Sequence, residues 1–164
     1  MDIKEHTTPE QLERYAFVWS LARLVIAAVS LFFGAMPIAY KLGISYGLLS
    51  VFWLVSGIAA IYLLYVWHQN DRSLFGRDNQ LDKWLFLIMA ITGINLGLVT
   101  VTDSNIGFSI AWNLGPTMAM LLMKATALLY LFVAYHLWHT WKANGESLFT
   151  ETPTPVKGPT ATPH

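Results

Sequence analysis

The sequence predicts an all-α membrane protein in which four transmembrane helices are arranged as two helical hairpins. Of its 164 residues 55% are apolar, and the mean hydropathy is +0.47. Lys41 is the only charged residue between positions 24 and 70, and Asp103 and Lys124 are the only ones between positions 84 and 141. A spanning helix needs about 20 residues, and each apolar block is long enough for two, so each block must fold back once.

The four spans follow in order from these blocks. We expect them at residues 15–40, 45–68, 83–101 and 116–141. Polar turn sequences support this placement, because Lys41-Leu42-Gly43 follows the first span and Asp103-Ser104-Asn105 follows the third.

The two ends of the chain are expected outside the bilayer. In the segment 1–14, Thr8 precedes Pro9 and Gln11, which is the pattern of a helix start with a Thr cap. Residues 143–164 are expected to form a disordered tail, because from Glu151 onward Thr and Pro alternate with little apolar surface to bury. A single transmembrane domain over 15–142 lies between the two ends.

Basic residues indicate the orientation. One side of the predicted bundle holds Lys4, Arg14, Arg72, Arg77, Lys83, Lys142 and Lys157, and the other side holds Lys41. Since cytoplasmic segments carry the excess of Lys and Arg, both termini are predicted in the cytoplasm. We expect the protein in the plasma membrane of a bacterium or an archaeon, with the lipid bilayer around it.

Charge and composition exclude several classes of protein. Ten basic and ten acidic residues give a net charge of zero, which argues against a nucleic-acid partner. The chain has no Cys, so disulfides, Cys zinc sites, iron–sulfur clusters and thiol catalysis are excluded. The apolar blocks show no pairing of a nucleophile with a base and no phosphate-binding loop, so we do not expect an enzyme.

An internal repeat is suggested by two similar segments. Residues 58–68 align with residues 126–136, and residues 70–75 recur, after an insertion, as residues 144–149. Two copies of one hairpin would have the same orientation and be related by an axis along the membrane normal. The alternative is that apolar helices with Tyr, Trp and His at the interface resemble one another by composition.

Two cations lie inside predicted spans, where an ionisable group costs about 2.5 to 3.5 kcal/mol. Arg23 is eight residues into the first span, about 12 Å at helical rise, and could reach back to the headgroups. Lys124 lies eight residues after Pro116 and could reach outward, or pair with Asp103. The other reading is that both belong to a functional site.

A candidate polar site within the membrane follows from the second reading. Thr117 lies on the same face of its helix as Lys124, and Asn95 in the third span needs a hydrogen-bond partner. A contact between Asn95 and Lys124 would join the third and fourth helices. The candidate residues are Arg23, Asn95, Asp103, Thr117 and Lys124.

Small residues predict a helix-packing surface. Gly93 and Gly97 form a small-xxx-small pattern in the third span, and Ser56 and Ala60 supply small residues in the second. Such residues let helix backbones approach closely. The surface could face the other hairpin, which we favour, or a different protein.

Three histidines, His68, His136 and His139, lie at the cytoplasmic ends of the second and fourth spans. Paired His residues are the axial ligands of haem b, and His136 and His139 are one helical turn apart, as in some metal sites. Their aromatic neighbours instead indicate a wet membrane interface, and no carboxylate in the span completes a metal site. We therefore expect no cofactor and no metal, with haem b as the remaining alternative.

The segment from the third helix to the fourth is similar to an uncharacterised family of small prokaryotic four-helix membrane proteins. That family has an Asn-bearing helix, an acidic-x-Asn-Pro loop, Gly-Pro and a helix with an embedded Lys. The matching residues are Asn95, Asp103, Asn105, Gly115, Pro116 and Lys124. The sequence departs from the pattern at Ile106, where the family has Pro, at Asp103, where it has Glu, and at Leu98, where it has Asp. The resemblance implies that Asn95, Asp103 and Lys124 lie together, and implies no function.

Small size, helix-packing faces and the lack of reactive groups favour a non-enzymatic membrane subunit, in a homo-oligomer or in a larger membrane complex. One alternative is an oligomeric transporter or channel for a small anionic or polar solute, lined by the two intramembrane cations. The other is a redox subunit that binds haem or quinone near His68 and His136.

Overall fold

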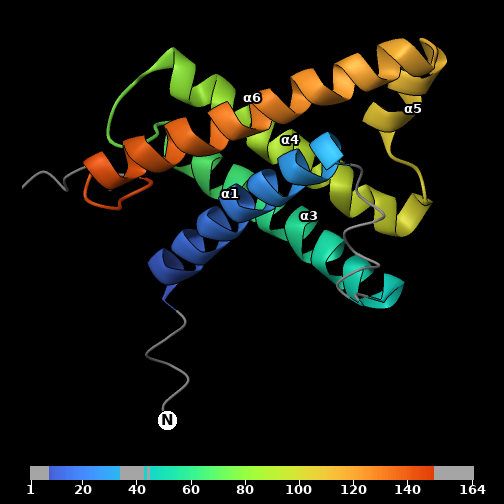
Figure 1. The fold of residues 1–164 in the computed structure, drawn as a ribbon. Coiled ribbons are helices and arrows are strands. Elements are labelled where there is room, and N and C mark those ends of the chain that lie inside the picture. The colour runs from blue at the N-terminus through green and yellow to red at the C-terminus, as the bar shows by residue number, and fades with distance from the viewer. Residues whose placement is uncertain (1–7, 34–42, 44, 150–164) are drawn as a thin grey trace, which may run out of the picture.

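The computed structural model describes residues 8–33, 43 and 45–149. Within these ranges the chain is helical and has no strand (Figure 1). Four helices are long and apolar enough to cross a membrane: α1 (Pro9–Phe33), α3 (Tyr46–Gln69), α4 (Gln80–Thr102) and α6 (Pro116–Ala143). The predicted all-α, four-span membrane fold is therefore confirmed, with residues 34–40 of the first predicted span outside the described ranges.

Local sequence explains where these helices begin. The Thr8 hydroxyl accepts a hydrogen bond from the Gln11 amide at 3.4 Å, as the cap pattern predicts. Ser45 and Asn79 cap α3 and α4 in the same manner. A short helix, α5 (Ile106–Asn113), was not predicted, and it fills the connection between α4 and α6. Gly115, at a positive φ of 90°, separates it from Pro116 at the start of α6.

The long helices alternate in direction, and Figure 1 shows the C-terminal end of α6 far from α5. The most extensive contacts join α3 to α4 and α1 to α6, so each predicted hairpin packs chiefly against the other one. One end of the bundle holds Arg14, Arg72, Arg77, Lys83 and Lys142, and we call it the basic end.

Two sequence motifs occur once in each half of the chain. The motif Gln-Leu-acid-base-aromatic-x-Phe occurs at 11–17, at the start of α1, and at 80–86, at the start of α4. The motif Trp-x-x-Asn-x-x-Ser-Leu-Phe ends α3 at 67–75 and ends α6 at 141–149. These motif pairs align residue 67 with residue 141. The alignment of the apolar helix sequences, by contrast, paired residue 67 with residue 135.

The aromatic core at the basic end shows this register in its contacts. The Phe17 ring lies 5.5 Å from the Trp141 ring and 6.1 Å from the Phe75 ring, between centroids. The equivalent Phe86 ring lies 5.5 Å from Trp67 and 6.4 Å from Phe149. Each Phe thus contacts the Trp of the other half and the Phe of its own half, as two copies related by a pseudo-two-fold axis require.

The backbone after α3 and after α6 has the same course. Asp71 and Arg72 have φ values of 51° and 58°, and the equivalent residues Gly145 and Glu146 have 67° and 66°. The two turns are in contact, because the Phe75 amide donates a hydrogen bond of 2.7 Å to the Leu148 carbonyl oxygen.

Part of the predicted tail belongs to this core. Leu148 and Phe149 are buried, so residues 148–149, which were expected in the tail that begins at residue 143, pack against the bundle. The reason is that one Leu-Phe pair supplies enough apolar surface to anchor a short segment, although the composition of the whole tail is polar. Residues 150–164 lie outside the described ranges.

Candidate functional site

The small residues of α3 and α4 bring the two helix backbones into close contact. A Cβ atom built on Gly57 would lie 2.9 Å from the Gly97 Cα, and one built on Gly93 would lie 2.7 Å from the Ala60 Cβ. Ser56 belongs to the same face, and its hydroxyl accepts a hydrogen bond from the Trp19 indole at 3.1 Å. The structure thus places the small-residue surface inside the bundle, between the two halves of the repeat.

Arg23 points into the bundle and does not reach back to the headgroups. Its side chain is 6% exposed, and its Nη2 donates to the Met89 carbonyl oxygen at 2.7 Å and to the Thr92 hydroxyl at 3.2 Å. Its Nε is buried without a hydrogen-bond partner in the described residues. Arg23 and Thr92 occupy equivalent positions of the repeat, so the guanidinium lies close to the pseudo-two-fold axis and joins α1 to α4.

A second buried charge, Asp82, is the centre of a polar cluster at the basic end. Its Oδ2 accepts from the Arg77 Nε at 3.0 Å, and its Oδ1 lies 2.7 Å from the His136 Nε2. Arg77 also donates to the Thr140 hydroxyl at 3.3 Å. The Asp82 side chain is 1% exposed, whereas that of Arg77 is 47% exposed and that of His136 25%.

The Asp82 cluster, made of Asp82, Arg77, His136 and Thr140, joins α4, its preceding loop and α6. Asp82 lies in the first turn of α4, where the helix dipole favours a negative charge. In the tautomer that carries a proton on Nε2, His136 donates to the Asp82 carboxylate. Sequence reasoning missed Asp82, Arg77 and Thr140, although the duplicated motif places Glu13 and Asp82 at equivalent positions and could have drawn attention to the acid.

A third group of charges lies on the other side of the basic end. Glu146 forms ion pairs with Arg14 and with Lys142. The Arg14 guanidinium and the Lys142 ammonium also lie over the Trp141 ring, at 5.5 and 5.3 Å from its centroid. The hydrogen bond from Lys142, with the nearby charge of Arg14, holds the pKa of Glu146 below its ordinary value. We call Glu146, Arg14 and Lys142 the Glu146 cluster.

The remaining members of the predicted polar site are not brought together. The Asn95 amide donates to Asn105 at 3.2 Å and accepts from the Ile106 amide at 3.3 Å, so it caps α5. Asp103 accepts from the Tyr46 hydroxyl at 3.1 Å. Lys124 is exposed on α6 and has no hydrogen bond or ion pair with any residue that the structure describes.

This arrangement replaces the expected contact between Asn95 and Lys124. The unpredicted helix α5 brings a free backbone amide to Asn95, which satisfies the side chain locally. The clustering of Asn95, Asp103 and Lys124 that the family resemblance implied is therefore absent from the described bundle. Thr117 is exposed on the same helix as Lys124.

The histidines are separated in the same way. His136 contacts Asp82, and His68 and His139 are exposed at the basic end. Over the ranges 8–33 and 45–149, no group of three or more His, Asp or Glu side chains is placed to hold a metal ion.

No family model, no curated protein and no solved structure matches this chain.

Proposed function

We propose that the protein is a non-enzymatic membrane subunit that packs the face of α6 around Lys124 against a helix of another membrane protein. The partner is a second copy of the chain or a larger complex. The observation that carries the proposal is the position of Lys124, an exposed cation within a membrane-spanning helix.

The other two charges inside the described bundle, Arg23 and Asp82, have hydrogen-bond partners within the chain. Arg23 is hydrogen-bonded to α4, and Asp82 is paired with Arg77 and His136. Lys124, by contrast, faces outward with no such partner, eight residues into α6 and so about 12 Å along the helix. The cost of a lysine in the hydrocarbon rises to about 2.5 to 3.5 kcal/mol at the bilayer centre, and a carboxylate or amide on a neighbouring helix would offset the part of it that Lys124 bears.

The neighbouring residues of α6 suit a helix interface. Thr117, Met120 and Leu128 lie on the same face as Lys124 and are exposed. Thr117 supplies a hydroxyl group, and Met120 and Leu128 supply apolar surface. Hydroxyl groups form hydrogen bonds between helices within a bilayer. A partner helix with an acidic or amide side chain at the depth of Lys124 would match this face.

We further propose that both termini lie in the cytoplasm and that the membrane is the plasma membrane of a bacterium or an archaeon. The support for this orientation is that the basic end gathers five cations from four segments of the chain: Arg14, Arg72, Arg77, Lys83 and Lys142. Cytoplasmic sides of membrane proteins carry such an excess.

The test is purification from native membranes in a mild detergent, with the mass of the complex and its protein components determined by mass spectrometry. We expect a stoichiometric partner or a homo-oligomer, which the variant Lys124→Met loses. The control variant Lys83→Met, which removes a cation at the basic end, should retain the complex. A monomeric wild type, or an unchanged complex in Lys124→Met, would contradict the proposal.

A further inference from the structure

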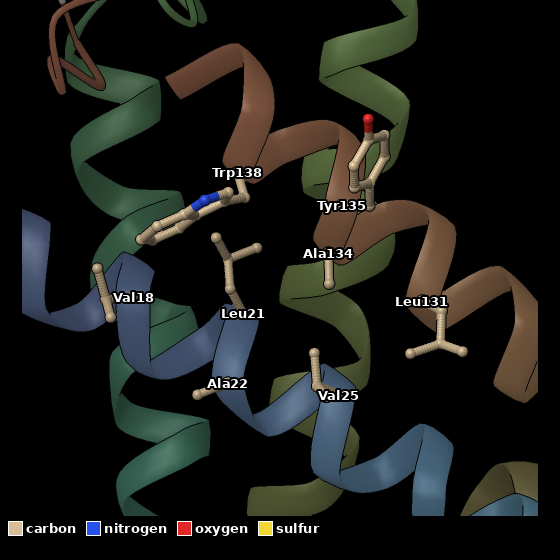
Figure 2. A pocket seen from close by; sticks show the side chains of 8 residues that line it. All are labelled: Val18, Leu21, Ala22, Val25, Leu131, Ala134, Tyr135 and Trp138. Carbon is tan, nitrogen blue, oxygen red and sulfur yellow. The ribbon is translucent and has the colours of Figure 1, made fainter. Parts of the chain in front are cut away.

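A groove of about 480 Å³ runs between α1 and α6 on the surface of the bundle. Figure 2 shows its two walls, with Val18, Ala22 and Val25 on α1 and Leu131, Tyr135 and Trp138 on α6. The lining is almost entirely apolar. The long axis of the groove follows α1 from Val25 toward Val18, which is the direction of the basic end.

The repeat explains why this groove is open. The equivalent interface between α3 and α4 is closed, because Gly57 contacts Gly97 there. Leu131 occupies the position in α6 that corresponds to Gly57, and Ala28 occupies the position in α1 that corresponds to Gly97. Larger side chains at these two positions prevent α6 from approaching α1 as closely as α3 approaches α4.

Both walls of the groove end in a cation at the basic end. Arg14 lies four residues before Val18, one helical turn along the same stripe of α1. Lys142 lies four residues after Trp138, and its ammonium is 5.1 Å from the centroid of that ring. The two side chains are about half exposed, at 52% and 45%. Glu146 balances one of the two positive charges, so the Glu146 cluster carries a single net positive charge.

We propose that this groove binds one anionic phospholipid of the surrounding leaflet. An acyl chain lies along the apolar walls between α1 and α6, and the phosphate is bound by Arg14 and Lys142. The net charge of the Glu146 cluster matches the single negative charge of a phosphodiester. Trp138 and Trp141 lie between the two parts of the site, at the level where aromatic side chains meet headgroups.

The test compares phosphatidylglycerol with phosphatidylcholine as added lipids, and native mass spectrometry of the full chain in a mild detergent measures the affinity of each. Charge attraction is worth about 1 kcal/mol for each unit of net positive charge near the phosphate, and the Glu146 cluster carries one such unit, so we expect phosphatidylglycerol to bind about fivefold more tightly. The double variant Arg14→Gln and Lys142→Gln should remove this preference. Glu146→Gln, which raises the net charge of the site from one to two, should increase the preference about a further fivefold.

The repeat provides matched controls. Ala22→Phe fills the groove without changing any charge and should lower the affinity for phosphatidylglycerol about tenfold. Ile91, at the equivalent position of α4, is already exposed, so Ile91→Phe should leave the affinity unchanged. Lys83→Gln, at the position equivalent to Arg14, should also leave it unchanged. Unchanged affinity in Ile91→Phe and Lys83→Gln would show that the losses at the groove are not a general effect of an added aromatic ring or of a removed charge.

Three results would overturn the proposal. One is equal affinity for the two lipids in the wild type. Another is a loss of preference in Lys83→Gln as large as in the Arg14 and Lys142 variant, which would indicate attraction to the whole basic end. The third is a dimer that excludes lipid and that Ala22→Phe dissociates, which would mean that a helix of a second copy occupies the groove.

Discussion

The contact between Gly57 and Gly97 predicts a contrast between two identical substitutions in one helix. In Gly57→Ala, the new methyl group would lie 2.9 Å from the Gly97 Cα, which is backbone and cannot move aside as a side chain can. The helices α3 and α4 must separate by several tenths of an ångström along their closest contact. Overpacking of this kind costs about 1 to 3 kcal/mol.

Gly47→Ala is the control, because a Cβ atom at Gly47 has no neighbour within 4 Å. Both substitutions replace Gly by Ala in α3, and the gain in helix propensity is smaller at Gly47, in the first turn, than at Gly57, in the interior. Ala favours the helix by about 0.5 to 1 kcal/mol over Gly, and Gly47→Ala should leave the free energy of unfolding unchanged or raise it by that amount.

The assay is unfolding by increasing SDS in mixed detergent micelles, followed by far-ultraviolet circular dichroism. We expect the free energy of unfolding to be lower by about 1 to 3 kcal/mol for Gly57→Ala than for the wild type, and to be no lower for Gly47→Ala. Equal stability of Gly57→Ala and Gly47→Ala would refute the conclusion that α3 and α4 are in backbone contact at this point.

Three further predictions concern charged groups and use the same unfolding assay. Asp82→Asn replaces one of the two accepting oxygens with an NH2 group, which cannot accept from Arg77 or His136, and should lower the free energy of unfolding by about 1.5 to 3 kcal/mol. Asp78→Asn, at an exposed position, should change it by less than about 0.5 kcal/mol. Arg23→Met replaces a buried cation with an apolar side chain of similar length, so stability should be unchanged or higher by about 1 kcal/mol, and a loss above 2 kcal/mol would contradict the assigned environment. The lowered pKa of Glu146 means that its ion pairs contribute fully above the ordinary Glu pKa and are lost only as the pH falls through the lowered value. The difference in the free energy of unfolding between the wild type and Glu146→Gln should therefore stay constant from about pH 7 to pH 5 and shrink below about pH 4.

The membrane fold could be predicted because its signals are strong and local. A block of apolar residues that is long enough for two helices permits few folds in a bilayer, and the charges at its ends fix the limits of the spans. The small residues of α3 and α4 were also visible, because close packing in a membrane depends on the residue type itself.

The polar contacts could not be predicted, because they depend on which helices are neighbours. The sequence placed Asn95 in the third span but gave no sign of α5, whose first amide satisfies it. The predicted third span began at residue 83 and left Arg77 and Asp82 outside it, whereas α4 begins at Gln80 and its first turn buries Asp82 against His136 of α6. The repeat was visible, but its register was set by the two short motifs and not by the apolar helices, whose residues resemble one another in any alignment.

The subunit proposal is tested most directly by photo-crosslinking in native membranes. A photoreactive amino acid replaces Leu128, on the face of α6 that carries Lys124, and in a control it replaces Ile91, on the lipid-exposed face of α4. We expect irradiation to yield one discrete protein adduct from position 128, none from position 91, and loss of the adduct in the Lys124→Met background. Adducts with lipid alone at both positions would contradict the proposal that this face of α6 binds another membrane protein.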